Sequence, residues 1–284
     1  MTFPEGFGEI VEKLRRSTVV VASSGRGGGS GFVTDEGGIV VTNAHVVSTR
    51  VVQVQLWDGE MREARVLARG GDVDLALLKI PPGGLAPVRF AESAELRKGD
   101  FVIAVGNPFG FIGAVTTGTV RSVGPVRGLG EDFYVHAAIR LAPGNSGGPL
   151  SNARGEVVGV NSMVVGNTAL SIPASRVREF MNRARMEATL GVLGRRVPLS
   201  LNGSPHIGLV IMEIQRESSA EAAALLPGDI IIGVNDRLFL NVTDVDEAFR
   251  SEGERMMRLQ FVRGDRTHIR SVTLVLHPRR NQAA

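Results

Sequence analysis

Short apolar runs separated by glycine dominate the chain from Thr18 to about Pro173. Runs of this length, bounded by turn residues, are typical of buried β-strands. So many of them favour a pair of antiparallel barrels over alternating strands and helices. The sequence therefore predicts an all-β domain here. Its predicted strands are Thr18–Val21, Gly31–Thr34, Gly38–Thr42, Val51–Leu56, Leu75–Ile80, Asp100–Gly106, Thr116–Val120 and Val157–Asn161.

A different pattern begins after Pro173. Apolar positions over Ala174–Met186 recur at the spacing of one helix face, and Gly191 and Gly194 interrupt that spacing. We therefore assign residues 1–190 to the first domain and residues 193–280 to a second, small α+β domain. The second domain has predicted strands at Gly208–Ile214, Asp229–Val234, Met257–Arg263 and Ser271–Leu276, and helices that begin at Ser218 and cover Thr243–Arg250.

Composition narrows the classes of function. The 284 residues contain no cysteine, which excludes disulfides and thiolate zinc sites. The formal charge is +3 and the sequence pI is about 9.9, yet the paired arginines at 15–16, 195–196 and 279–280 are far apart in the chain. Nucleic-acid binding needs clustered basic residues. We therefore interpret these arginines as solvated surface charge and expect no nucleic-acid partner.

No apolar run approaches the ~20 residues that a membrane-spanning helix needs. The segment Met1–Gly6 also lacks the basic-then-apolar pattern of a signal peptide. We expect no membrane span, and either the protein is made without a signal peptide or the chain begins after it.

Candidate chemistry appears in the segment Pro143–Leu150, where Ser146 has glycines nearby on both sides. Gly144 allows a tight turn that aims its own N–H and that of Ser146 at one point, as an oxyanion hole requires. We assign Ser146 as the nucleophile, and Gly144, Asn145 and Ser146 to the oxyanion hole. Alone, the motif is also compatible with a glycine-rich turn that has no catalytic role.

A serine nucleophile needs a base, and the base needs an orienting carboxylate. His45 follows an apolar strand, whereas His136, the competing histidine, lies in a strand-like run and is interpreted as structural. Asp74 directly precedes a buried strand, which favours a shielded carboxylate there over Asp72 in the turn. His45, Asp74 and Ser146 occur in the order used by chymotrypsin-type enzymes, and they form the predicted catalytic triad.

Together these motifs resemble the HtrA (Deg) family of trypsin-like serine proteases with a C-terminal PDZ domain. The resemblance implies a chymotrypsin-like fold of two six-stranded antiparallel barrels, with the active site between them, followed by a PDZ domain that binds peptide or regulates the protease. It also implies unfolded or misfolded protein segments as substrates, a role in protein quality control, and an extracytoplasmic (periplasmic) location. The resemblance rests on Gly29–Val33, Thr42–Val47, Asp74–Leu78, Gly106–Gly110, Gly144–Leu150 and Ser171–Pro173.

The same resemblance implies a homotrimer. The family trimerises through aromatic residues near the start of the protease, where this chain has Phe3 and Phe7. The loop between Val21 and Gly29 is short, unlike that of the cage-forming members, so a large particle of several trimers is not expected.

The resemblance also implies a specificity. Trypsin has an acidic residue six places before its nucleophile, whereas this chain has Arg140, so cleavage after Lys or Arg is not expected. The family lines its pocket with aliphatic residues, which implies cleavage after small or medium aliphatic residues. We interpret Arg140 as solvent-facing; alternatively it enters the pocket and favours acidic residues. The pocket and its wall are assigned to Leu141, Asn161, Ser162, Met163 and Val164.

The second domain departs from the family pattern. Arg196–Ser200 occupies the expected place of the loop that binds a peptide carboxylate, whose pattern is an aromatic residue or leucine, then glycine, then an aliphatic residue, and Pro198 removes a backbone donor there. A PDZ domain adds its peptide to a sheet edge beside a helix, and we expect that edge in the strand after residues 197–202. Val245 and Phe249, one helical turn apart, are candidates to line the groove, with core packing as the alternative.

Two other classes of function compete with a protease. A chaperone or scaffold that only binds unfolded segments would leave the complete triad unused. A nucleic-acid binder is supported by the pI alone. No metal cluster or phosphate loop is predicted, since the glycine-rich segment Gly25–Ser30 lacks the lysine of a P-loop, so we expect no cofactor and no metal.

Overall fold

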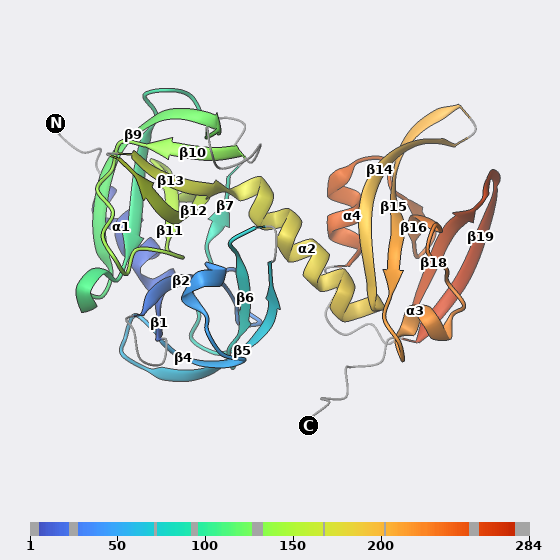
Figure 1. Ribbon diagram of the computed structural model, residues 1–284, viewed down its shortest axis with the longest axis horizontal. Helices are drawn as coiled ribbons and strands as arrows, with labels where there is room; N and C mark the ends of the chain where they lie inside the picture. Colours follow the sequence, from blue (N-terminus) through green and yellow to red (C-terminus); the bar gives the residue numbers. More distant parts are fainter. Residues whose placement is uncertain are drawn as a thin grey trace. The chain divides into compact units, whose positions relative to one another are not determined.

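The computed structural model describes residues 6–22, 28–70, 73–91, 96–126, 133–166, 168–201, 203–249 and 256–275. The chain divides into two compact units, Met1–Phe180 and Met181–Ala284 (Figure 1). Each unit has its own hydrophobic core. The division falls within the helix α2 (Ala174–Leu190). The domain boundary suggested by the sequence lies just past the end of this helix.

Six strands of the first unit close into a barrel in the order β1-β2-β3-β6-β5-β4 (Figure 1). Exposed and buried positions alternate along β4, as the two-residue period of a strand requires, and Val52 and Val54 join the barrel core. The strands are β1 (Thr18–Ala22), β2 (Gly29–Val33), β3 (Ile39–Thr42), β4 (Val51–Gln55), β5 (Met61–Arg69) and β6 (Ala76–Lys79).

A second six-stranded barrel follows in the same unit. Its strands run in the order β11-β8-β9-β10-β13-β12, and the pairing of β11 with β12 closes the ring. The two antiparallel barrels confirm the predicted all-β, chymotrypsin-like fold. The strands are β8 (Phe101–Gly106), β9 (Ala114–Pro125), β10 (Phe133–Ala137), β11 (Pro149–Asn152), β12 (Glu156–Val165) and β13 (Thr168–Pro173), with the short β7 (Arg89–Phe90) parallel to β12.

A helix that the sequence analysis did not predict, α1 (Phe7–Ser17), precedes the first barrel strand. Its apolar face packs on β8 of the second barrel, where Leu14 is buried against a cluster that includes Ile103. On its other side, the Arg16 guanidinium lies 4.9 Å from the centre of the Trp57 ring, between β4 and β5. The helix therefore contacts both barrels.

The second unit is a sheet in the order β14-β15-β16-β18-β19, with β17 paired to β16 and two short helices. The side chain of Ser218 caps α3, because it accepts the N–H of Glu221 at 3.2 Å. The strands are β14 (Val192–Leu201), β15 (Ser204–Ile214), β16 (Ile230–Val234), β17 (Arg237–Leu238), β18 (Met256–Arg263) and β19 (Asp265–Val275), and the helices are α3 (Ser219–Ala222) and α4 (Val242–Ala248).

Two expectations for the second unit are wrong. Arg196–Ser200, expected to form a loop, lies within the continuous strand β14, which pairs with β15 over its whole length. As a result β15, the expected edge, is covered by β14 and β16, and β14 itself is one edge of the sheet. Pro198 is tolerated because an edge strand needs backbone hydrogen bonds on one side only.

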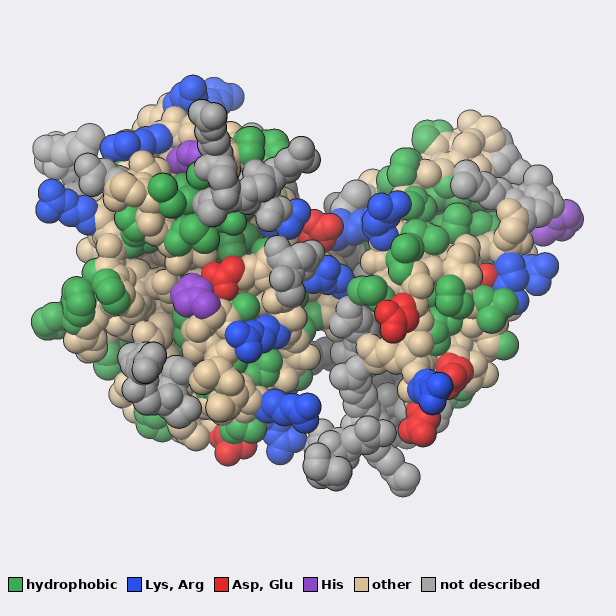
Figure 2. Space-filling model, viewed as in Figure 1, with side chains coloured by type: hydrophobic (Ala, Val, Ile, Leu, Met, Phe, Trp, Pro, Cys, Tyr) green, Lys and Arg blue, Asp and Glu red, His purple; other side chains and the backbone are tan. Residues whose placement is uncertain are grey.

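Basic side chains are scattered over the face shown in Figure 2, between apolar and acidic ones. None of the described helices is long and apolar enough to cross a membrane. Within the described ranges, no group of three or more His, Asp or Glu side chains is arranged to hold a metal ion.

Candidate active site

His45 and Asp74 are carried by neighbouring strands of the first barrel. His45 lies in a single 3₁₀ turn (Ala44–Val46) shortly after β3, and Asp74 lies just before β6. These strands pair antiparallel, with Thr42 opposite Ala76. The register therefore brings both side chains to the same end of the barrel, on strands that are fixed by the core.

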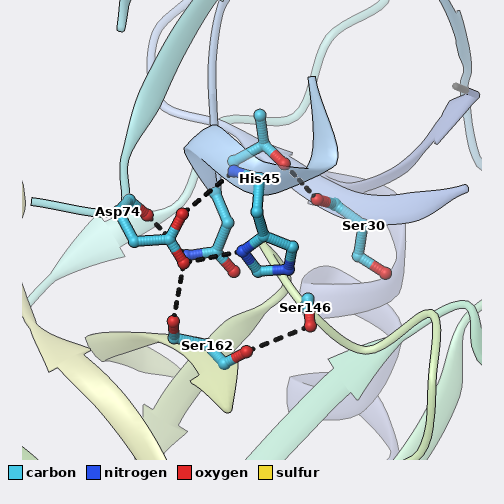
Figure 3. A network of polar contacts seen from close by, with 7 residues as sticks. Ser30, His45, Asp74, Ser146 and Ser162 are labelled. Carbon is cyan, nitrogen blue, oxygen red and sulfur yellow. Dashed lines mark hydrogen bonds and ion pairs between the residues drawn. The ribbon is translucent and has the colours of Figure 1, made fainter. Parts of the chain in front are cut away.

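Two hydrogen bonds join His45 to Asp74 (Figure 3). The backbone N–H of His45 donates to Asp74 Oδ1 at 3.0 Å, and its ring Nδ1 lies 2.7 Å from Oδ2. The buried Asn43 holds the backbone of the aspartate, since its Nδ2 donates to the Asp74 carbonyl oxygen at 2.7 Å. The contacts leave Nε2 as the ring nitrogen that is not bonded to the aspartate.

The contact between His45 and Asp74 shifts the pKa of both side chains. The hydrogen bond to Asp74 raises the pKa of His45 above its ordinary value, although partial burial acts in the opposite direction. Burial favours the neutral form of Asp74, but hydrogen bonds from the ring and backbone of His45 and from Ser162 outweigh it and lower the pKa of the carboxyl. Asp74 is therefore charged at neutral pH and makes His45 a stronger base than an isolated histidine.

Ser162 of β12 connects the two barrels at this point. Its hydroxyl donates to Asp74 Oδ2 at 2.9 Å, and its carbonyl oxygen accepts the hydroxyl of Ser146 at 3.1 Å. Sequence analysis assigned Ser162 only to the pocket wall and missed its bond to the aspartate. No sequence signal could have found it, because the partners are 88 positions apart.

Ser146 lies in the loop between β10 and β11 of the second barrel. Figure 3 shows its side chain below the open edge of the His45 ring, with its hydroxyl directed to the Ser162 carbonyl. The three predicted triad residues thus come together from two barrels. In this state the hydroxyl bonds to Ser162, while His45 bonds to Asp74.

The loop around Ser146 requires its glycines. Gly144 has φ +103° and Gly147 has φ +86°, the left-handed region that other residues rarely adopt. A Cβ on Gly147 would lie 2.0 Å from the Ser30 carbonyl oxygen, and one on Gly144 would lie 2.5 Å from the Asn107 carbonyl oxygen. At Gly144 and Gly147 the chain can pass this close to Asn107, just after β8, and to Ser30 of β2 only without side chains.

The predicted oxyanion donors differ in their partners. The N–H of Asn145 donates to the Ala142 carbonyl oxygen at 3.0 Å, so it is engaged within the loop. The N–H groups of Gly144 and Ser146 have no hydrogen-bond partner among the described residues. These two groups are the ones able to donate to a developing oxyanion.

The chain is similar to known serine proteases. Residues 29–160 match the trypsin-like peptidase domain family. The chain is 34% identical over 298 residues to the mitochondrial serine protease HTRA2 of Bos taurus, covering 91% of this chain and 65% of the relative. It is also 34% identical to serine protease HTRA1 of Xenopus laevis over 257 residues, 81% of this chain and 56% of that protein. Over most of its length the chain is therefore similar to HtrA serine proteases, and residues 29–160 match the trypsin-like peptidase domain.

A solved structure of an HtrA family member has the same fold. The HtrA-type protease AlgW with decapeptide aligns with a TM-score of 0.59 and 22% identity over 96% of this chain and 98% of that one. The chain spans between about half and two thirds of the length of the curated HtrA relatives it matches.

The residues predicted for the specificity pocket of this chain have different surroundings. The Asn161 side chain is buried and bonded to the Pro149 carbonyl and the Ser171 hydroxyl, so its amide serves the barrel. Leu141 packs against the second barrel core. Met163 is half-buried, and Val164 and Arg140 are exposed.

His136, the competing base, is engaged elsewhere. Its Nδ1 lies 3.0 Å from the hydroxyl of Ser122, and its Nε2 lies 3.1 Å from the carbonyl oxygen of Gly124. Both partners lie on β9, which pairs with the strand of His136. Its ring is therefore bonded within the second barrel.

Val245 and Phe249 are buried in the core of the second unit, at 2% and 7% exposure. Their predicted role in a peptide groove stays a prediction. Asp72, Phe3 and His277 lie outside the described residues.

Proposed function

We propose that the chain is a serine endopeptidase that cleaves unfolded or misfolded protein segments through His45, Asp74 and Ser146. The proposal rests on the 2.7 Å distance between His45 Nδ1 and Asp74 Oδ2. Ser146 joins the same network, because its hydroxyl bonds to Ser162, which bonds to Asp74. The names of the HtrA relatives, all serine proteases, support it.

In this mechanism the Ser146 hydroxyl rotates from the Ser162 carbonyl to His45 Nε2 and attacks the carbonyl carbon of the substrate. His45 takes the proton, and the charged Asp74 stabilises the imidazolium. The N–H groups of Gly144 and Ser146 donate to the oxyanion. His45 then protonates the leaving amine, which leaves an acyl group on Ser146, and a water activated by His45 releases it.

The proposed specificity is for small or medium aliphatic residues on the acyl side of the cut bond. Apolar surface is supplied by Leu141, in the same loop as Ser146, and by Met163 and Val164 on β12. Arg140 is exposed to solvent. A pocket with apolar walls accepts aliphatic side chains and leaves a charged one without a partner.

On an unfolded model protein we expect cuts after aliphatic residues, mapped from the new termini by mass spectrometry, and none with Ser146→Ala. Arg140→Ala should leave the pattern unchanged, because an exposed side chain does not select the substrate. Cuts that persist in Ser146→Ala would contradict the mechanism. Cuts after acidic residues that disappear in Arg140→Ala would instead place the guanidinium in the pocket.

We further propose that the second unit, residues 193–280 in the assignment above, is a PDZ domain that binds a peptide or regulates the protease. A leucine–glycine–aliphatic triplet, Leu190-Gly191-Val192, stands directly at the start of the edge strand β14. Gly191 has φ +72°, and a Cβ there would lie 2.2 Å from that of Ser218, so the position requires glycine. This triplet is a better candidate for the carboxylate loop than Arg196–Ser200.

A homotrimer is the proposed assembly, in keeping with the family resemblance. Phe7, one of the two aromatic residues behind this proposal, is half-buried against Phe101, with ring centroids 6.1 Å apart. We expect light scattering to give three times the chain mass of 30.2 kDa. A particle of a single chain mass at micromolar concentration would rule the trimer out.

A further inference from the structure

Ser30, a residue that the proposed mechanism does not use, lies directly beneath the nucleophile loop. It belongs to β2 and has no exposed surface. Its hydroxyl donates to the carbonyl oxygen of Gly144 at 2.6 Å, across 114 positions of sequence. Its backbone N–H donates to the carbonyl oxygen of Ser146 at 2.8 Å. One buried residue therefore holds the loop at two points.

The direction of the Ser30 hydroxyl is fixed by Asn107. A serine hydroxyl has one proton and two lone pairs. The backbone N–H and side-chain Nδ2 of Asn107 donate to this oxygen at 2.9 and 3.1 Å and occupy both lone pairs. The hydroxyl proton has the Gly144 carbonyl as its remaining partner.

Asn107 is held as firmly as Ser30. It is 6% exposed, its Nδ2 also donates to the Val19 carbonyl at 2.9 Å, and its Oδ1 accepts the N–H of Gly113 at 2.9 Å. Every polar atom of this side chain is used. The network therefore has one arrangement, and it ends on the loop that carries the oxyanion donors.

The two anchored carbonyls restrict the orientation of the amide that lies between them. A peptide unit is planar, so fixing its carbonyl fixes the direction of its N–H. The anchored units, Gly144–Asn145 and Ser146–Gly147, flank the unit whose N–H belongs to Ser146. Gly144 itself, the other oxyanion donor, carries one of the anchored carbonyls.

We infer that Ser30, with Asn107 behind it, is a positioning residue that aims the N–H groups of Gly144 and Ser146 at the oxyanion. The inference rests on the proposed function, because it assigns these groups their catalytic role. Ser30 contacts no reacting atom. It acts on the transition state, where negative charge develops, and leaves ground-state binding of the substrate unchanged.

Ser30→Ala in the full chain should lower kcat for a short aliphatic peptide by about 10- to 100-fold, with KM changed less than about twofold. The affinity for a peptide boronate, whose tetrahedral anion occupies the oxyanion site, should fall by the same factor. End-point labelling with a fluorophosphonate counts the folded active sites in each preparation. Ser151→Ala is the matched control, since it deletes another buried hydroxyl bonded to a backbone carbonyl, at 3.4 Å, and should leave kcat unchanged.

If Ser30→Ala does not fold, Asn107→Ala provides the second test. It removes one of the two donors that orient the hydroxyl and should lower kcat by about fivefold at constant KM. A kcat for Ser30→Ala equal to that of Ser151→Ala, or a loss that appears in KM, would overturn the inference while the protease assignment stands. A wild-type protein that is neither labelled at Ser146 nor active would overturn both.

Discussion

Ser146→Ala and His45→Ala should each lower the rate of peptide hydrolysis by roughly four to six orders of magnitude, because triad members act as a unit. Without Ser146 there is no nucleophile, and without His45 the hydroxyl keeps its proton. The measurement is kcat for an aliphatic peptide, together with labelling by a fluorophosphonate, which should fail for Ser146→Ala.

The matched control for the base is His136→Ala. It removes a histidine of the same unit whose ring bonds, among the described residues, to Ser122 and Gly124, and kcat should stay within about threefold of wild type. Full turnover in His45→Ala, together with loss of activity in His136→Ala, would assign the base to His136. The geometry around His45 would then describe a structural contact.

Asp74→Asn should lower kcat by roughly three to four orders of magnitude while the protein stays folded. The amide can take the place of the carboxylate, but it provides no negative charge to stabilise the imidazolium. It also replaces one of the two acceptor oxygens by an NH₂ donor, so the proton on Nδ1 is no longer held in place. The rate that Asp74→Asn retains above that of Ser146→Ala should come from the N–H groups of Gly144 and Ser146, which still donate to the oxyanion.

The same variant should move the acid limb of the pH–rate profile. In the wild-type enzyme the hydrogen bond to Asp74 raises the pKa of His45, so the base becomes protonated, and activity is lost, at a pH above the ordinary histidine value. Asp74→Asn removes that cause, and the limb should move to lower pH. Asp35→Asn, which removes a carboxylate from the turn before β3, should leave the limb in place. If the acid limb of Asp74→Asn stays at the wild-type pH, a group other than His45 determines that limb.

The barrels and the three candidate catalytic residues could be predicted from the sequence because their signals are local. A buried strand shows as an apolar run, and His45, Asp74 and Ser146 each stand in a short motif. β5 gave no such signal, since Ala64 is its only fully buried position. The edge strand β14 was missed for a similar reason, because exposed and half-buried residues fill most of it.

The contacts that tie the candidate site together could not be predicted. Ser30 meets Gly144 and Ser162 meets Asp74 across 114 and 88 positions, and a serine in a strand is compatible with many roles. The direction of a hydroxyl depends on every donor around it, and those donors become neighbours only after both barrels close.

The division of the candidate site between two barrels has a consequence for how a protease is made. Both His45 and Asp74 depend on the register of β3 against β6, whereas Ser146 arrives with the second barrel. A growing chain whose first barrel has closed holds a base without a nucleophile. With the proposed triad, hydrolysis therefore requires both barrels to be folded, because neither barrel alone holds both the base and the nucleophile.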